Sequence, residues 1–383
     1  MSKNSFPGIP LTVCEDPKGG IHQSDLVSLA EGKLRRLDPD TAQEERDKMD
    51  DYQSIKKGNV FEHIVQYGAV PDFVVVRKCE MLTGQELTLA QRLSLFGKEA
   101  WTGQDALSCM NQLDADGKML FGQLKKEESR MKKAIAFSEN HSFGEFVLEN
   151  MAVEKKLANG GIVMEQAVVD QIQDRALETR RMLNHWYGID DDPNVHVYWQ
   201  VPLEHSTTMT KLFGVLVDQL SGYEFNPDDE ISIRGIIDMV IVDTLRKTVK
   251  IVDLKYSVYA TSWDYQYYAG YKFIQSSLYE LLVEMNLSDK YKLEYEPSDE
   301  YKLVYEPFDF VVQSENIESP IRWIVPSRKL IKFSMMHGLS RKHGSREFPT
   351  VPTIMAQMLH LQNTQDYRMH PKFTASNQTG YIE

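Results

Sequence analysis

The chain has 383 residues and a formal net charge of -13 at pH 7, with 43 lysines and arginines against 56 aspartates and glutamates. An acidic excess of this size excludes a protein that coats nucleic acid over its whole surface, because such binding depends on basic residues that displace counterions from phosphates. It leaves room for a localised basic channel. The length allows a large buried core, so we expect one elaborated domain or a core with an accessory domain.

Cysteine content and hydropathy exclude further classes. Cys14, Cys79 and Cys109 are far apart and form no Cys-x-x-Cys pair, so neither a disulfide framework nor a four-cysteine zinc site fits. No apolar run is long enough to span a bilayer, and the first 20 residues contain no apolar signal segment. We therefore expect a soluble, cytoplasmic protein with no membrane contact.

The N-terminal region reads as an arm followed by helices. Residues 1–38 contain several turn-forming residues, namely Pro7, Pro10, Pro17 and Gly19-Gly20, which predict an irregular arm. Asp40 can cap a charged helix that runs toward Lys57, and a second helix follows over residues 57–65. From about residue 85 to about 190 the apolar spacing is mostly helical, which predicts an inserted helical subdomain.

The next part of the chain, about residues 195–325, predicts a sheet. The expected strands cover residues 195–201, 212–220, 231–242, 248–254, 305–313 and 321–325, with a turn at 226–229 before the third. A helix over residues 263–279 separates the fourth strand from the fifth. The fold class is therefore α/β (α+β), with a mixed, mainly antiparallel sheet flanked by helices.

The C-terminal part, residues 326–383, is predicted as a basic segment and tail. Its basic residues are Arg328, Lys329, Lys332, Arg341, Lys342 and Arg346, with no acidic residue between the first and the last. We predict that this segment contacts phosphates. A solvated basic loop is the alternative.

Two of the predicted strands carry the candidate chemistry. Asp238 lies in the apolar run Ile-Ile-Asp-Met-Val-Ile-Val, and Asp253 and Lys255 end the next strand. Because strand side chains alternate between faces, Asp253 and Lys255 point the same way while Leu254 packs into the core. Two carboxylates about 4 Å apart repel by roughly 4 kcal/mol at an effective dielectric near 20, so the arrangement favours a cation between them.

The alternative interpretation is that these are ordinary solvated strand residues. Against it, the run around Asp238 is too apolar for a strand that faces solvent. We therefore predict a divalent metal site at this edge of the sheet.

This pattern resembles the PD-(D/E)XK nuclease superfamily. Asp238 matches the first motif aspartate, and Asp253-Leu254-Lys255 matches the D/E-x-K tripeptide. The pair Gln275-x-x-x-Tyr279 looks like the Q-x-x-x-Y motif of the RecB-like branch, and its residues are one helical turn apart, so both can face the same edge of the sheet. The alternative for this pair is a buried polar contact that satisfies strand ends. The resemblance implies a restriction-endonuclease-like core, with residues 39–383 as one nuclease domain.

An upstream motif narrows the resemblance. Residues 57–65, with Pro-Asp-Phe at 71–73, resemble the Gly-x-x-x-His/Glu helix that supplies the first metal ligand, and also the opening of phage and prophage exonucleases of the RecE or YqaJ type. Counting from Gly58 puts Glu62 at the ligand position. The RecE type has histidine there, and lambda-type exonucleases have glutamate. A register shifted by one residue would use His63 instead, and both remain open.

The resemblance implies hydrolysis of phosphodiester bonds with one or two Mg²⁺ ions per site, for which Mn²⁺ can substitute. The metal would be held by Glu62, Asp238 and Asp253 with the main-chain carbonyl of Leu254, an oxygen-rich set of the kind that magnesium prefers. Lys255 would position or deprotonate the attacking water and offset charge on the phosphate. The motif pair on the helix would orient Lys255 and the phosphate.

Other residues are predicted to contact DNA. Aromatic side chains follow Lys255 closely: Tyr256, Tyr259, Trp263, Tyr265, Tyr267, Tyr268 and Tyr271. Aromatic faces stack on unpaired bases for about 1–3 kcal/mol each, although most tyrosines at helical spacing belong to a core. From this region and the strand before it we predict Trp263 and Arg234 as DNA contacts, in addition to the basic C-terminal segment.

The resemblance also implies a biological role. Recombination exonucleases of phage and prophage digest one strand at a double-stranded DNA end, work with a single-strand annealing protein and often form rings, so a homo-oligomer is expected. Two alternatives stay open. One is an endonuclease or a RecB-like repair or defence nuclease, and the other is a non-catalytic DNA-binding or assembly module on a nuclease scaffold.

Overall fold

The computed structural model describes most of the chain between residues 20 and 365. The ranges are 20–31, 53–77, 84–96, 101–116, 126–158, 161–287, 304–305, 308–316, 322–324, 340–343 and 346–365, with residues 9, 11–14, 37, 44 and 82. The chain forms two compact units, Met1–Gln66 with Arg175–Glu383, and Tyr67–Asp174. Among the described helices, none combines the length and hydropathy needed to cross a bilayer.

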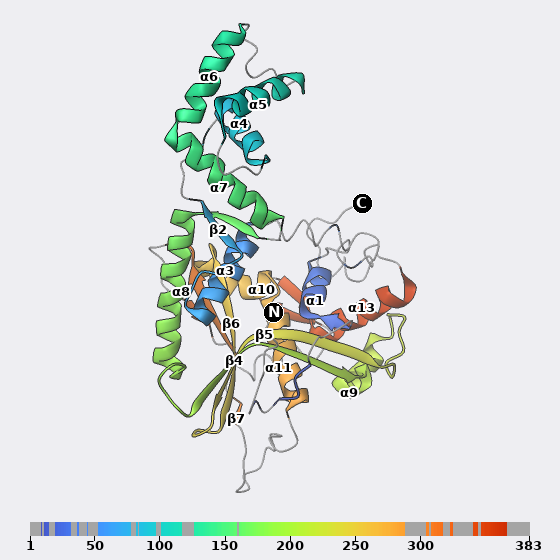
Figure 1. Cartoon of the computed structure of the whole chain (residues 1–383). Helices are drawn as coiled ribbons and strands as arrows, with labels where there is room; N and C mark the ends of the chain where they lie inside the picture. The colour runs from blue at the N-terminus through green and yellow to red at the C-terminus, as the bar shows by residue number, and fades with distance from the viewer. Residues whose placement is uncertain are drawn as a thin grey trace. The chain divides into compact units, whose positions relative to one another are not determined.

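The first unit is built on a mixed sheet flanked by helices (Figure 1). Its described strands are β1 (Ile21–His22), β4 (Val195–Thr207), β5 (Ile231–Asp243), β6 (Thr248–Ser257), β7 (Val304–Tyr305), β8 (Asp309–Ser314) and β9 (Arg322–Ile324). Strand β5 pairs antiparallel with β4 and β6 and parallel with β1, whereas β6 pairs parallel with β7 and β8. Strand β9 pairs antiparallel with β8. The predicted mixed α/β fold with a helix-flanked sheet is therefore confirmed.

Helices surround this sheet. The first unit contains α1 (Gln23–Ala30), α3 (Gln53–Tyr67), α10 (Trp263–Ala269), α11 (Lys272–Asn286) and α13 (Val351–Thr364). Helix α8 (Gln166–Tyr187) belongs to this unit from residue 175 onward. Helix α11 contacts β4, β5 and α1, and its fully buried Phe273, Ile274 and Leu278 join the main core. Strands β10 (Ser340–His343) and β11 (Arg346–Pro349) form a separate antiparallel hairpin.

The second unit is mostly helical. It contains α4 (Gly84–Ser94), α5 (Gly103–Ala115), α6 (Glu127–Glu139), α7 (His141–Leu157) and the parallel pair β2 (Val74–Arg77) and β3 (Ile162–Glu165). Its apolar core includes Met110, Phe143 and Phe146, and the ring of Trp101 meets Phe143 edge to face at 5.4 Å. The sequence predicts a helical block at about residues 85–190. The unit covers Tyr67–Asp174, so both of its boundaries lie about 16–18 residues earlier in the chain.

Three expectations about secondary structure are wrong. Residues 212–220, predicted as a strand, lie in α9 (Met209–Phe213) and a 3₁₀ helix, η2 (Gly214–Leu220). The side chain of Thr208 accepts a hydrogen bond from the Lys211 amide (3.1 Å) and so starts the helix. An apolar run of this length fits a strand or a buried helix equally well, which explains the error.

The N-terminal arm is not irregular throughout. Residues 21–22 form β1, and α1 begins directly after it, with the His22 amide donating to Asp25 (3.0 Å) in a capping box. Leu26 and Leu29 are fully buried.

The predicted helix over residues 263–279 is in fact two helices, α10 and α11. They are separated at Gly270 and Tyr271, where the backbone of Tyr271 is left-handed (φ 52°).

Candidate active site

The two central strands of the sheet separate at Asp238. The β5–β6 ladder runs from Asp243 opposite Thr248 to Met239 opposite Val252 and ends there. Beyond that point β5 continues with β4 and β6 continues with β8. Two residues beyond Val252 on β6, the amide of Leu254 donates to Oδ2 of Asp238 (3.0 Å). A side chain thus takes the place of a main-chain rung, and polar groups gather where the strands part.

Lys255 lies among the carboxylates at this point. Its Nζ is 2.5 Å from Oδ2 of Asp253 and 3.7 Å from Oδ2 of Asp238, and it donates to the main-chain oxygen of Leu254 (3.1 Å). The Asp253 side chain is fully buried, and those of Asp238 and Lys255 are 14% and 24% exposed. The structure therefore brings the two predicted acids and the predicted amine together, while the Leu254 side chain lies in the core.

Helix α11 supplies Gln275 and Tyr279, both buried. Gln275 Nε2 donates to Oδ1 of Asp253 (2.6 Å), so this amide holds the carboxylate from the side opposite Lys255. The Tyr279 ring lies directly over Gly235 on β5, where an added Cβ would be 2.7 Å from Cε1 of the ring. Burial, together with the negative charges of Asp238 and Asp253, raises the pKa of Tyr279 above its ordinary value, so its phenol stays protonated.

Glu62 on α3 belongs electrostatically to the same cluster. Burial raises the pKa of Glu62 to about 8; the charges of Asp238 and Asp253 add to this effect and Lys255 opposes it. His63, the other motif candidate, is next to Glu62 and half-buried.

The pKa values of Asp253 and Lys255 are shifted by burial and by the charges of the same cluster. Burial raises the pKa of Asp253 to about 7 against the opposing charge of Lys255. For Lys255, burial works to lower the pKa, but the surrounding carboxylates outweigh it and the pKa rises above its ordinary value. One ammonium group therefore faces three carboxyl groups.

Two contacts hold α3 over this part of the sheet. The ring of Phe61 stacks on that of Tyr256, the residue after Lys255, with centroids 4.9 Å apart and an interplanar angle of 22°. One turn earlier, Lys57 Nζ is 2.8 Å from a carboxylate oxygen of Glu315, just beyond β8. Both contacts join the helix that carries Glu62 to the strands that carry its neighbours.

The donor set of this cluster fits a hard divalent cation in its chemistry. Three carboxyl groups and a main-chain carbonyl offer the oxygens that Mg²⁺ prefers. Because burial and mutual repulsion raise the pKa of Glu62 and of Asp253, an added positive charge would stabilise the ionised forms of both. Among the described residues, no three acidic, histidine or cysteine side chains already surround a single ion position. The ammonium group of Lys255 lies between Asp238 and Asp253 instead.

The residues predicted to contact DNA differ in how exposed they are. Trp263 is 4% exposed and meets Phe310 edge to face at 5.8 Å, so its prediction as a DNA contact is wrong: a ring packed in the core offers no face to a base. By contrast, Tyr259 and Tyr265 from the same aromatic cluster are 60% and 59% exposed. Arg234 is half-buried on β5, opposite Glu204 of β4 and His22 of β1.

The basic C-terminal segment is described only in part. Arg341 and Lys342 lie in β10, opposite Phe348 and Glu347 of β11. Arg328, Lys329 and Lys332 lie outside the described residues.

Sequence reasoning missed the groups that place the site. Gly235 precedes Asp238 by three residues, and a glycine inside an apolar strand is a signal of close approach, here by Tyr279. The contacts of α3 with Tyr256 and Glu315 join residues that are distant in the chain and follow no local pattern.

No protein-family model matches this chain, and no curated protein matches it either. The function has to be inferred from the site itself.

Proposed function

We propose that the protein is a magnesium-dependent deoxyribonuclease with a PD-(D/E)XK core that acts as an exonuclease on double-stranded DNA ends. The observation that carries the proposal is the convergence of Asp238, Asp253 and Lys255 at the point where β5 and β6 part. A carboxylate pair with an adjacent amine, buried at a sheet opening and joined by a third carboxyl group, suits the hydrolysis of a charged ester with a cation present.

The order of elements around the site supports a restriction-endonuclease-like core. Helix α3 precedes the antiparallel strands β4, β5 and β6, and α11 follows them. The chain then returns as β8, which pairs parallel with β6. The residues of the resemblance are thus distributed over one helix before the sheet, its two central strands and the crossover helix.

One or two Mg²⁺ ions, or Mn²⁺ in their place, would be held by Glu62, Asp238 and Asp253 with the carbonyl of Leu254. When bound, the ion supplies a lowered pKa for a coordinated water and neutralises negative charge on the phosphate. Burial is the main cause of the raised pKa values of Glu62 and Asp253. Both would have to lose their protons to bind the ion, so binding would release protons.

The remaining groups have roles that follow from their contacts. The pKa of Lys255 is raised, so its amine is a cation that orients water and offsets charge on the scissile phosphate rather than a base. Gln275 fixes the orientation of the Asp253 carboxylate through its hydrogen bond. Tyr279 stays protonated and serves as a hydrogen-bond donor at the same edge.

The choice of DNA ends rests on the resemblance to phage and prophage recombination exonucleases, with a single-strand annealing protein as the partner and a homo-oligomer as the active form. The exposed rings of Tyr259 and Tyr265, in the segment just after β6, are suited to stack on unpaired bases of a frayed end. A ring that encloses DNA would also keep an acidic protein on its substrate without a positive net charge. The site of action would be the cytoplasm of a bacterium or phage-infected cell.

The test compares three labelled DNA substrates with Mg²⁺: a linear duplex, a nicked circle and a closed circle. We expect the wild-type protein to degrade the linear duplex and spare the closed circle, and the Lys255→Ala variant to bind DNA without cleaving it. Cleavage of the closed circle would support the alternative of an endonuclease or RecB-like repair nuclease. Binding without hydrolysis by the wild-type protein would support a non-catalytic module.

A further inference from the structure

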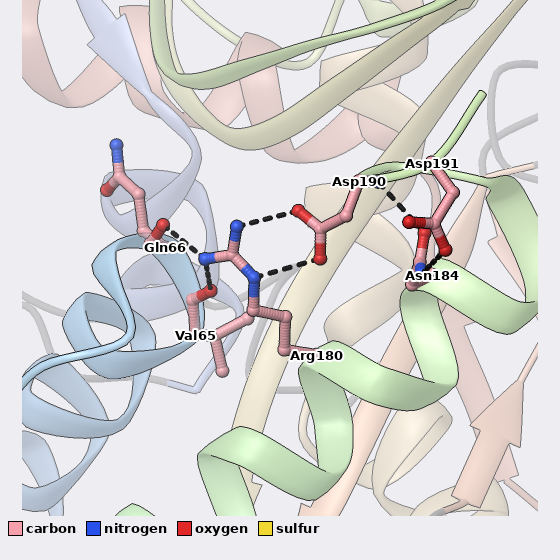
Figure 2. A network of polar contacts seen from close by, with 6 residues as sticks. All are labelled: Val65, Gln66, Arg180, Asn184, Asp190 and Asp191. Carbon is pink, nitrogen blue, oxygen red and sulfur yellow. Dashed lines mark hydrogen bonds and ion pairs between the residues drawn. The ribbon is translucent and has the colours of Figure 1, made fainter. Parts of the chain in front are cut away.

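Arg180 connects the end of α3 to the segment after α8 (Figure 2). Its Nη1 donates to the main-chain oxygens of Val65 (3.0 Å) and Gln66 (2.7 Å). Its Nε and Nη2 donate to the two carboxylate oxygens of Asp190 (3.1 and 2.7 Å). One guanidinium group thus binds the end of one helix and a carboxylate at the same time.

The α3 end of this connection needs such a donor. The last carbonyls of an α-helix have no partner within the helix, and a cation there also interacts favourably with the helix dipole. Helix α3 ends at Tyr67, and Gly68 follows in the left-handed region (φ 73°). Arg180 therefore provides an external cap for the C-terminal turn of α3.

The other end of the connection is itself held in place. Asn184, one turn after Arg180 on α8, accepts a hydrogen bond from the Asp190 amide (2.9 Å) and donates to the Asp191 carboxylate. The same helix is attached to β8 at two levels, where Thr179 donates to Gln313 (3.2 Å) and Tyr187 donates to Asp309. Strand β8 is paired in turn with β6, which carries Asp253 and Lys255. Arg180 therefore links the end of α3 to β6 through α8 and β8.

Glu62 lies three and four residues before the two carbonyls that Arg180 binds, which is one helical turn. A shift or rotation of the last turn of α3 therefore moves Glu62 with it. The charge of Glu62 raises the pKa of Lys255, and the charge of Asp238 raises the pKa of Glu62. The distances of Glu62 from these two groups therefore affect the electrostatics of the cluster.

We propose that Arg180 is a positioning residue that fixes Glu62 relative to Asp238 and Lys255 and thereby sets the affinity of the site for a divalent cation. This inference rests on the proposed function, because it presupposes that the cluster binds such a cation. In this role Arg180 would act through the end of α3 and would not itself be a metal ligand.

The test measures Mn²⁺ binding to the full chain by isothermal titration calorimetry. We expect Arg180→Met to weaken Mn²⁺ binding about tenfold, the lower end of the effect of removing groups that orient metal ligands. Arg180→Lys keeps the charge but loses the forked geometry and should be intermediate. The matched control is Arg246→Met, which removes an exposed arginine 3.5 Å from Asp243 in the same unit and should leave Mn²⁺ affinity unchanged.

A double-mutant cycle distinguishes a specific effect of Arg180 on the position of Glu62 from a general loosening of the structure. If Arg180 acts through Glu62, Arg180→Met should have no further effect on Mn²⁺ affinity in a Glu62→Gln background. An unchanged affinity in Arg180→Met, or an equal loss in both backgrounds, overturns the inference while leaving the proposed function intact. A wild-type protein that binds no Mn²⁺ overturns the proposed function itself.

A second variant covers the case in which Arg180→Met does not fold. Asp190→Asn leaves Arg180 in place and removes one of its charged partners, and it should weaken Mn²⁺ binding and speed hydrogen exchange of the amides in the last turn of α3. Slow exchange there together with full Mn²⁺ affinity would count against the proposal.

Discussion

Two lysines of strand β6 form lysine–aspartate pairs that differ in charge balance. Lys250 Nζ is 2.8 Å from Asp309 Oδ2, with side-chain exposures of 10% and 0%, and Tyr187 donates to the same carboxylate and lies beneath the ammonium at 5.4 Å. Five residues later, Lys255 faces Asp253, Asp238 and Glu62. The first pair has one charge of each sign, which suits a structural contact. The second has acid in excess, which is the condition for binding an added cation.

The largest effect is expected when the balanced pair of Lys250 and Asp309 is broken. Lys250→Met leaves Asp309 buried without its counter-charge, and such a loss costs about 3–5 kcal/mol of folding free energy. Urea unfolding monitored by circular dichroism measures it. The double variant Lys250→Met with Asp309→Leu should recover most of the loss, because apolar residues can replace a buried ion pair. A loss below about 1 kcal/mol in the single variant would show that the pair is not structural.

The next effect concerns the unbalanced pair. Asp253→Asn should lower Mg²⁺-dependent cleavage by about 10²–10³-fold, the size of effect expected when a preorganised polar group is lost from an active site. It should not destabilise the metal-free protein at pH 8, because it removes one of the repelling carboxylates. Cleavage rates test the loss of activity, and urea unfolding of the same sample tests the unchanged stability. Retained cleavage would remove Asp253 from the site.

A smaller effect concerns the packing behind the site. Gly235→Ala places a methyl group 2.7 Å from the Tyr279 ring, and overpacking of this kind typically costs about 1–3 kcal/mol of folding free energy. The matched control is Gly58→Ala on α3, where an added Cβ meets nothing within 4 Å. This control should be stabilised by about 0.5–1 kcal/mol, as for glycine replacement inside a helix. Thermal unfolding compares the two, and equal effects would contradict the close approach of Tyr279.

The last effect is the pH dependence of stability. Folding raises the pKa of Glu62 from 4.5 to about 8 and that of Asp253 from 3.8 to about 7. Between these values the folded state binds more protons than the unfolded state, so stability is highest at the acidic end and falls as pH rises through about 7 to 8. We expect the melting temperature of the metal-free protein to fall by at least ~2–4 °C, the change that corresponds to about 1 kcal/mol.

Scanning calorimetry from pH 5 to pH 8.5, with and without Mn²⁺, checks this dependence. Mn²⁺ should stabilise the protein more at the alkaline end, and the Glu62→Gln variant should show a flatter profile. Stability that rises with pH in the metal-free protein would contradict the excess of negative charge at the site.

The parts of the fold and site that could be predicted from the sequence are those that a local period determines. Alternation along a strand places Asp253 and Lys255 on one face and Leu254 in the core, and the apolar run around Asp238 marks a buried strand. The spacing of Gln275 and Tyr279 likewise places both on the buried face of α11. These inferences need no knowledge of distant contacts.

What could not be predicted depends on tertiary context. The apolar run at residues 212–220 lacks a period that separates helix from strand, and the left-handed backbone at Tyr271 has no sequence signal, since that residue is not a glycine. Trp263 is an aromatic beside the site, but only the position of Phe310 shows that it is buried. The contacts of Arg180 with α3 span more than a hundred residues of chain.

The hydrogen bond from Gln275 occupies Oδ1 of Asp253 and leaves Oδ2 as the oxygen that faces Lys255. The hydrogen bond uses one lone pair of Oδ1 and fixes the carboxylate orientation, which favours ligation of a cation through Oδ2 alone. Calcium commonly takes both oxygens of a carboxylate and six to eight ligands in all, whereas magnesium needs only one or two carboxylates and completes its octahedron with water. Discrimination against calcium would thus come from an amide on a neighbouring helix, and not from the acidic residues themselves.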